Sequence, residues 1–387
     1  METQKFPVQL FLHYILFYSA QAMYGVYFNL YLSDIGFSNT MVGLLSALST
    51  LILLISQPFW GIVSDKAEKK NTVLKILFLV SALSALMYYG STNYLYVIIV
   101  SLIFTVFYTP LVPLQDNLTL EYLAGKRWNF GHIRMGGTIG YAFTVVIAGV
   151  LLKSRYSHIF WVVSLFLLLC FLMMFIMPTV PGFRTRAEKA PLSTILKNKT
   201  FMCLVGFNLA YSLGTNFYST YYPIYFESLA GSSSLVGVLV FTCAIVEVPF
   251  LLVINKILKK LGIIKLLVAA TMVSGLRWLL LYILTNPVLI ILANLLHGFS
   301  FSSFTYCLVT YINENVPKSL RATGQTFNTL ISAFFSKVVF GFLGGVASDV
   351  FGVNKIMLVS SVITFVASIV FGMLLAKLKD NGDETTA

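Results

Sequence analysis

Five ionisable residues lie deep inside otherwise apolar runs of this sequence, where a charge is unexpected. They are Asp116, Arg134, Glu247, Arg277 and Lys337. Lys126 lies in a basic turn between two apolar runs. Asp116 lies ten residues before Lys126, and Arg134 lies eight residues after Lys126. If the two runs are antiparallel membrane helices, a rise of ~1.5 Å per residue places both charges near the middle of a ~30 Å hydrocarbon core. Charges at that depth are costly and usually functional, although a fixed ion pair locking two helices is the structural alternative.

A second pair repeats this geometry from the other side of the chain. The turn at Asn286 lies nine residues after Arg277 and eleven residues before His297. Arginine can hold a carboxylate or vicinal hydroxyls with two parallel hydrogen bonds and keeps its charge. His297 can relay a proton near neutral pH, or it can be a neutral side chain bonded to its neighbour. Glu247 is the candidate proton carrier, with a structural Glu247–Lys337 pair as the alternative.

The composition indicates a helical integral membrane protein. The chain has 387 residues, 58% hydrophobic and only 10% charged, whereas a soluble domain has about 25% charged residues. Its apolar runs span about 20 residues, which is typical of membrane helices and not of barrel strands. All four cysteines fall inside these runs, so we expect no disulfide framework, no metal site and no cofactor.

We expect an all-α protein with twelve transmembrane helices. The predicted spans are 7–32, 41–63, 72–90, 94–123, 129–152, 158–177, 201–226, 234–258, 263–284, 288–313, 322–347 and 355–376. Nineteen lysines and arginines fall on the side of the termini, against three on the other side. This asymmetry predicts cytoplasmic termini, and it explains the net charge of +12 without nucleic acid. Membrane lipid is the expected contact of these basic loops.

The two halves of the chain repeat each other. Tyr27, Tyr31, Val42 and Gly43 recur as Tyr221, Tyr225, Val236 and Gly237, always 194 residues later. We therefore predict two pseudo-symmetric bundles of six helices, 1–177 and 201–387, joined by a cytoplasmic linker, 178–200. Because both bundles start on the same side, the repeats are parallel, an arrangement found in transporters.

The loop after the second span resembles the signature loop of the major facilitator superfamily, with a glycine, an aspartate four residues later, and then bases. Here these are Gly61, Asp65 and Lys69. This resemblance implies a conformational role for the loop. Gly61 would let two helices approach closely, and Asp65 would accept from the N-terminus of a neighbouring helix.

Asp116 and the segment 130–141 resemble the lactose permease and its oligosaccharide:proton symporter relatives. The resemblance implies that Asp116 and Arg134 bind solute and that Tyr141 stands where the family stacks an aromatic ring on the sugar. Residues 109–116 look closer still to the phenylpropionate-permease branch. The chain departs from the family at Ser300, which replaces a proton-carrying carboxylate, and at Asn294, which replaces a lysine.

Spans 7–32 and 201–226 are rich in tyrosines and amides, and the fold implied by the resemblance uses them to line the cavity. The solute-binding residues we predict are Asp116, Arg134, Tyr141, Tyr24, Tyr27, Asn216 and Tyr218. Some of these tyrosines can instead belong to the interfacial aromatic belt. For proton coupling we predict Glu247, supported by His297, Arg277 and Lys337.

These observations predict a monomeric secondary transporter of the cell membrane that imports a small organic solute with protons by alternating access. The solute is a sugar, an oligosaccharide or a nucleoside, and an aromatic carboxylic acid is the first alternative. A multidrug effluxer of the same fold explains Asp116 and Arg134 less well. A non-transporting receptor would need no proton carrier in the middle of the membrane. We find no ATP-binding loop or catalytic triad, so an enzyme is not expected.

Overall fold

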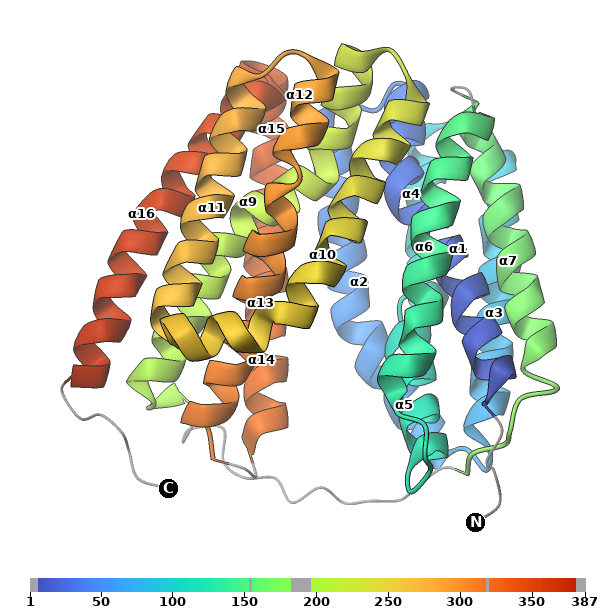
Figure 1. Cartoon of the computed structure of the whole chain (residues 1–387). Helices are drawn as coiled ribbons and strands as arrows, with labels where there is room; N and C mark the ends of the chain where they lie inside the picture. The colour runs from blue at the N-terminus through green and yellow to red at the C-terminus, as the bar shows by residue number, and fades with distance from the viewer. Residues whose placement is uncertain (1–5, 153–154, 182–195, 318–319, 381–387) are drawn as a thin grey trace. The chain divides into compact units, whose positions relative to one another are not determined.

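The computed structural model describes residues 6–152, 155–181, 196–317 and 320–380, and this part of the chain is built of helices. The helices of the first half are α1 (Val8–Asp34), α2 (Asn39–Lys66), α3 (Lys70–Leu86), η1 (Met87–Tyr89), α4 (Tyr94–Tyr108), α5 (Leu111–Leu123), α6 (Phe130–Leu152), η2 (Tyr156–His158) and α7 (Ile159–Met173) (Figure 1). The second half contains α9 (Lys199–Ala230), α10 (Ser233–Leu261), α11 (Ile263–Ile283), α12 (Pro287–Ala293), α13 (Leu296–Asn315), α14 (Arg321–Ala333), η4 (Phe334–Val339), α15 (Phe340–Phe351) and α16 (Val353–Asp380). The all-α membrane architecture predicted from the sequence is confirmed.

Ten of the twelve expected spans are long and apolar enough to cross a membrane, counted over the described residues. The other two, α1 and α9, have ample length, with 27 and 32 residues, but carry many tyrosines and amides. A membrane helix with such polar groups is stable when these groups face other helices or water and not lipid. These are the two helices for which the sequence predicts a role in lining a polar interior.

Three spans are interrupted or change helix type near their middle. Span 94–123 divides into α4 and α5 at Pro110, which has no N–H to donate. Span 288–313 divides into α12 and α13 at Asn294, whose side-chain amide donates to the carbonyl of Ile290 at 2.8 Å. The eleventh span contains η4, a stretch of π-helix, and such wide turns occur often at functional sites. Apolar periodicity alone predicts continuous helices at all three places.

The described chain forms two compact units. Unit 1 comprises Met1–Phe37, Leu48–Arg186 and Ser232–Phe241, and unit 2 comprises Ser38–Ala47, Ala187–Gly231 and Thr242–Ala387. Most of the predicted linker, 182–195, lies outside the described residues. The division into bundles at 178–200 therefore stays a prediction.

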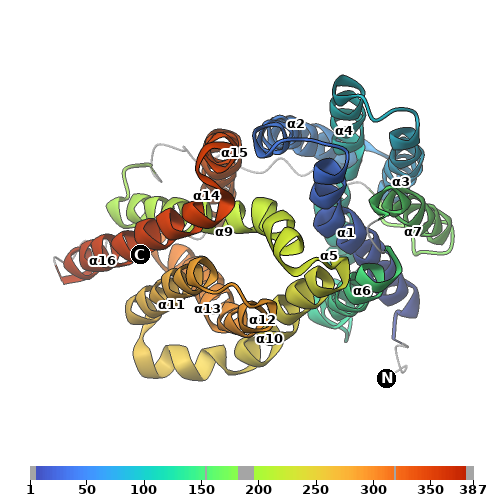
Figure 2. The same cartoon turned by 90° about the horizontal axis from the view of Figure 1, so that it is seen from above.

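In unit 1, α1 lies along α6 and α7 (Figure 2). Close contact between α1 and α6 depends on glycines of α6. A Cβ atom at Gly136 would lie 2.6 Å from the backbone oxygen of Phe11, and one at Gly140 would collide with the backbone of Ile15. Glycine permits this close approach because it has no side chain, and small residues are common for the same reason where membrane helices pack.

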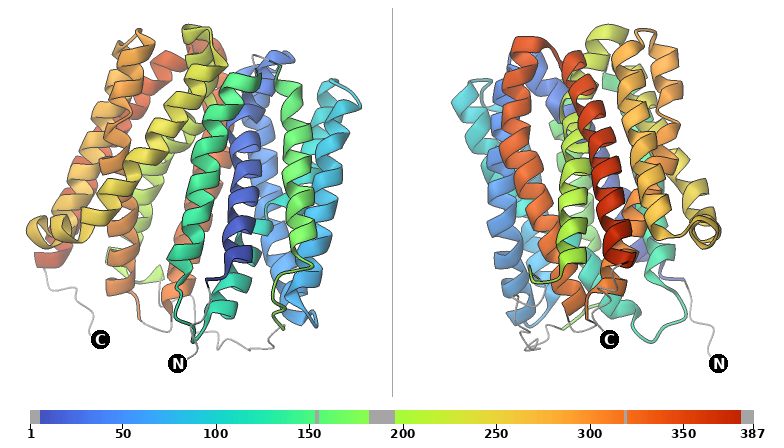
Figure 3. Two further views of the ribbon diagram at one scale, coloured as in Figure 1. Left: turned by 45° about the vertical axis from the view of Figure 1, so that its right-hand side comes forward. Right: turned by 90° about the vertical axis from the view of Figure 1, so that its left-hand side faces the viewer.

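In unit 2, α11 packs against both α16 and α13, and α16 also packs against α9 (Figure 3). The core between these helices is apolar and aromatic, and the ring of Tyr211 stacks on Phe304 with centroids 3.8 Å apart. Helix α10 contains Pro249 and bends sharply, so that its C-terminal part runs across the neighbouring helices in Figure 1.

The repeated tyrosines and glycines act as pairs at close helix crossings, one crossing in each unit. In unit 1 the Tyr27 hydroxyl donates to the carbonyl of Val145 at 2.6 Å, and a Cβ at Gly237 would lie 2.6 Å from the same oxygen. In unit 2 the Tyr221 hydroxyl donates to the carbonyl of Gly341 at 2.6 Å, and a Cβ at Gly43 would lie 2.8 Å from it. The sequence repeat therefore encodes a packing device.

The signature-like loop between α2 and α3 forms ion pairs around Lys70. The buried ammonium of Lys70 lies 3.3 Å from Asp65 and 2.6 Å from Glu121. Lys69 is exposed and pairs by its backbone with Pro181. A Cβ at Gly61 would meet nothing within 4 Å in the structure, so the expectation that Gly61 permits a close helix approach stays a prediction.

Asp349, near the end of α15, caps the start of α2 within unit 2. Its carboxylate accepts from the backbone N–H of Asn39 at 3.0 Å and of Thr40 at 2.8 Å, and from the Thr40 hydroxyl at 2.6 Å. The first N–H groups of a helix have no partner within the helix, and they carry partial positive charge. Asp349 accepts hydrogen bonds from these N–H groups, offsets their partial positive charge and so links α2 to α15.

Replacing Asp349 by Ala should lower the stability of the protein by about 1–2 kcal/mol, as the loss of a helix cap does. Asp349→Asn retains one acceptor oxygen and should lose less. Thermal unfolding of the purified protein in detergent measures both variants. Identical unfolding temperatures for the parent and Asp349→Ala would show that the cap does not contribute to stability.

Candidate solute and proton site

Each unit holds one polar cluster at the depth of the charged residues. In unit 1, Asp116 lies on α5, shortly after the break at Pro110. The hydroxyl of Tyr14 on α1 donates to Asp116 Oδ1 at 2.6 Å and lies 3.3 Å from the Thr119 hydroxyl. The carboxylate is half-buried, so it keeps lone pairs with which it can accept from the hydroxyls of a solute.

Arg134 does not complete a direct ion pair with Asp116 among the described residues. Its guanidinium instead lies over the ring of Tyr18, with Cζ 3.9 Å from the ring centroid. Tyr18 in turn stacks on Tyr14 at 6.0 Å. Acid and base are thus linked through two tyrosines, and the fixed pair considered from the sequence is not formed. A donor fork, an acceptor and aromatic faces lie together, which suits a ring bearing polar substituents.

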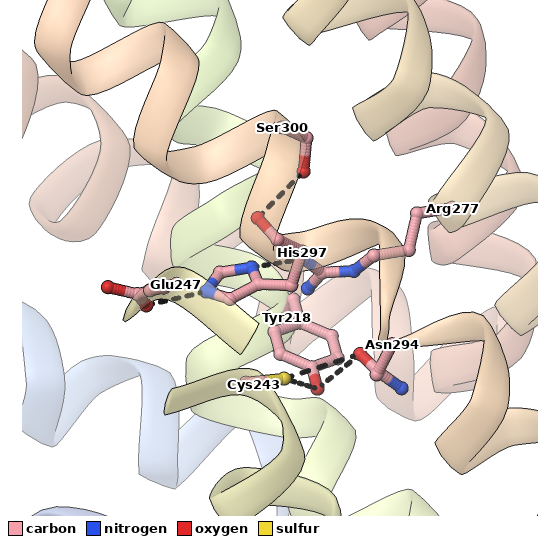
Figure 4. Close-up of polar contacts among 7 residues, drawn as sticks. All are labelled: Tyr218, Cys243, Glu247, Arg277, Asn294, His297 and Ser300. Carbon is pink, nitrogen blue, oxygen red and sulfur yellow. Dashed lines mark hydrogen bonds and ion pairs between the residues drawn. The ribbon is translucent and has the colours of Figure 1, made fainter. Parts of the chain in front are cut away.

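In unit 2, Arg277, His297 and Glu247 form a chain (Figure 4). Arg277 Nη1 contacts His297 Nδ1, and His297 Nε2 lies 3.2 Å from Glu247 Oε1. Guanidinium nitrogens only donate, so Nδ1 must accept and the imidazole proton must sit on Nε2. We therefore assign a neutral His297 that accepts from Arg277 and donates to Glu247.

Asn294 organises the groups around this chain. Its side-chain oxygen accepts from the Tyr218 hydroxyl at 2.9 Å and lies 3.6 Å from the Cys243 sulfur (Figure 4). Arg277 lies over the rings of Tyr218 and Trp278, at 4.5 and 4.2 Å from their centroids. Arg277 is only 1% exposed, and its Nε and Nη2 have no hydrogen-bond partner among the described residues.

The remaining predicted residues are Tyr24, Tyr27, Tyr141, Asn216 and Lys337. Tyr27 is fully buried and bonded to Val145, so the structure assigns it to helix packing. The Tyr24 hydroxyl lies 3.2 Å from that of Tyr88, and Tyr141 is half-buried on α6. Asn216 donates to the Ser336 hydroxyl at 2.5 Å. Lys337 is exposed and has no ion pair with any described residue, so the alternative Glu247–Lys337 pair is not formed.

The set of solute and proton residues predicted from the sequence omits several residues of the clusters. These are Tyr14, Tyr18, Thr119, Cys243, Trp278 and Asn294. The spacing of these residues in the sequence could have identified some of them. Tyr14 precedes Tyr18 by four residues, and Cys243 precedes Glu247 by four, so each pair shares one helix face. No group of three or more His, Cys, Asp or Glu side chains in the described residues can hold a metal ion.

Helical spans arranged as two units, with a polar cluster in each, are typical of membrane transporters of the major facilitator fold. The chain belongs to the MFS_1 like family, whose model matches residues 8–359. It is therefore a multi-pass membrane transporter of small solutes and not an enzyme.

Individual relatives are distant but cover most of the chain. The maltose permease of Geobacillus stearothermophilus is 23% identical over 98% of this chain and 96% of its own. The probable 3-phenylpropionic acid transporter of Escherichia coli K12 is 21% identical over 76% of this chain and 78% of its own. Among solved structures, a point mutant of the nucleoside transporter NupG superposes with a TM-score of 0.84, at 18% identity, over 95% of this chain and 99% of that one. This likeness shows the fold.

Gly137 provides the space in which Arg134 reaches Tyr18. A Cβ there would lie 2.7 Å from Arg134 Nη1 and 2.6 Å from Tyr18 Cδ2. Gly137→Ala should destabilise the protein by about 1–3 kcal/mol, as overpacking does. Gly25→Ala on α1 is the matched control, since its Cβ would meet nothing within 4 Å. Thermal unfolding should separate the two variants, and equal unfolding temperatures would contradict the packing described for Arg134.

Proposed function

We propose that the protein imports a small organic solute together with protons, and that the solute carries a ring with polar substituents. A sugar, an oligosaccharide or a nucleoside fits this description. The observation that supports the proposal most strongly is the Arg277–His297–Glu247 chain, because it places one ionisable carboxylate at the end of a fixed series of hydrogen bonds. The name of the maltose permease relative supports the solute class.

Solute binding is assigned to the unit 1 cluster. Asp116 offers an acceptor, Arg134 a planar donor fork, and Tyr14 and Tyr18 offer ring faces. A solute hydroxyl can take the place of the Tyr14 hydroxyl on Asp116, while Arg134 turns from the Tyr18 ring to a second polar group. Binding then exchanges internal contacts for contacts of the same type, so few polar groups lose their partners.

Proton binding is assigned to Glu247. A proton added to His297 would make both ring nitrogens donors and would break the contact with Arg277. A proton added to Glu247 leaves every contact in place, because the carbonyl oxygen of the acid still accepts from His297 Nε2. The chain thus favours Glu247 as the carrier, with Arg277 and His297 in positioning roles. The Glu247 side chain is half-buried, with 30% of its surface exposed.

An aromatic carboxylic acid is the second candidate solute. Arg134 can hold a carboxylate in two parallel hydrogen bonds, and one relative is named as a probable 3-phenylpropionic acid transporter. Drug efflux has no comparable support in these contacts. Further parts of the proposal are that the transporter is a monomer in the cell membrane, with cytoplasmic termini as the distribution of lysine and arginine indicates.

Glu247→Gln should separate solute movement from proton coupling. The amide keeps an acceptor for His297 but cannot release a proton, so reconstituted protein should exchange labelled solute across the membrane and fail to accumulate it against a gradient. Solute counterflow and pH-driven uptake in proteoliposomes measure the two activities. Accumulation equal to that of the parent would remove Glu247 from the proton path.

Asp116→Asn should weaken solute binding by about tenfold or more, because hydrogen bonds to a charged acceptor contribute ~1.5–3 kcal/mol. Asp34→Asn, at the exposed end of α1, is the control and should bind as the parent does. Calorimetric titration of the purified variants gives both affinities. Unchanged affinity in Asp116→Asn would place the solute elsewhere.

A further inference from the structure

Lys337 is the one deep charge for which the described residues provide no partner. It lies in η4, fourteen residues from each end of the Thr323–Phe351 span, and so at the middle of the membrane. Its side chain is exposed and makes no hydrogen bond or ion pair in the described part of the chain. An ammonium group is costly in lipid at this depth, so we expect Lys337 to face a polar interior and to need a negative partner there.

The α9 groups that bond to the eleventh span around η4 include no carboxylate. Polar groups of α9 and of the eleventh span instead bond to one another in a ladder. Asn208 donates to Asn328 at 3.2 Å and to Ser332 at 2.7 Å, and Asn216 donates to Ser336 at 2.5 Å. All of these groups are neutral. The π-helix marks the same place as irregular, which is common at functional sites.

The deep charges do not balance. Arg134, Arg277 and Lys337 contribute three positive charges, and Asp116 and Glu247 contribute two negative ones, which leaves +1. Unit 1 is balanced by Arg134 and Asp116, so the excess lies in unit 2. The two orphan nitrogens of Arg277 show the same surplus of donors.

We propose that the transported solute is a monoanion bearing a carboxylate, and that Lys337 is its counter-ion. This inference rests on the proposed function and narrows its solute to acids, such as a sugar acid or an aryl carboxylate. The carboxylate supplies the negative charge that the deep residues of unit 2 lack.

The same charge count gives the charge carried in each transport cycle. In the empty transporter, with Glu247 ionised, the five residues sum to +1. A proton on Glu247 adds one charge and the solute carboxylate subtracts one, so the loaded state is again +1. The solute anion and the proton cross together as a neutral pair. A neutral solute would instead give a loaded state of +2, and its transport would respond to the membrane potential.

Binding to the purified full-length protein tests the proposal with matched pairs of ligands. The pairs are 3-phenylpropionate with 3-phenylpropanol, and glucuronate with glucose. We expect one acid to bind and its neutral partner to bind about tenfold more weakly or worse. Lys337→Met should remove this preference, Lys337→Arg should retain most of it, and Lys75→Met, whose ammonium lies over the Phe175 ring at 3.7 Å, should leave it intact. Equal binding of both members of a pair, or an unchanged preference in Lys337→Met, would overturn the proposal.

Uptake into proteoliposomes separates failure of this inference from failure of the proposed function. With a pH gradient imposed, we expect the same rate of uptake whether a potassium–valinomycin gradient sets the potential to zero or to inside-negative. Uptake that needs the pH gradient but speeds up at negative potential would refute the anionic solute and leave proton coupling standing. Uptake indifferent to the pH gradient would refute both.

Discussion

A charge inside an apolar span needs a partner in the protein or in a molecule that the protein binds, and this constraint shapes the arrangement of the deep residues. Arg277 meets Glu247 through a neutral imidazole, and Asp116 meets a tyrosine hydroxyl. Each arrangement gives the charged group a hydrogen-bond partner without a direct ion pair, which would be harder to break. Contacts of this kind can be exchanged for contacts to a solute or a proton at modest cost, which is what a transport cycle requires.

The irregular parts of the helices lie next to these charges. The break at Pro110 comes six residues before Asp116, the break at Asn294 comes three before His297, and η4 contains Lys337. Non-helical backbone at membrane depth is tolerated where protein or water supplies hydrogen-bond partners. Thr109 and Asn294 donate to backbone oxygens one turn earlier and supply some of these partners. The irregular backbone and the deep charges therefore indicate a polar interior at the same places along the chain.

Much of the fold could be predicted from the sequence, because depth along a membrane follows from counting residues. Residue counting places Arg277 and His297 at the same depth, and the structure brings these two residues into contact. Counting does not give the rotation of a helix about its axis, which decides whether Arg134 meets Asp116 or the Tyr18 ring. For the same reason the sequence predicts a cavity role for Tyr27, whose hydroxyl is used instead at a helix crossing. The role predicted for Gly61 stays open, because a sequence motif contains no information about which helix lies opposite it.

Proton movement accompanying solute entry tests the central claim most directly. The solute found by the binding screen is added outside proteoliposomes in a weakly buffered suspension, and the external pH is recorded alongside solute uptake. We predict that the outside becomes more alkaline as solute enters, by about one proton per solute, since Glu247 is the single carrier assigned here. Solute entry with no change in external pH would contradict proton coupling through the Arg277–His297–Glu247 chain.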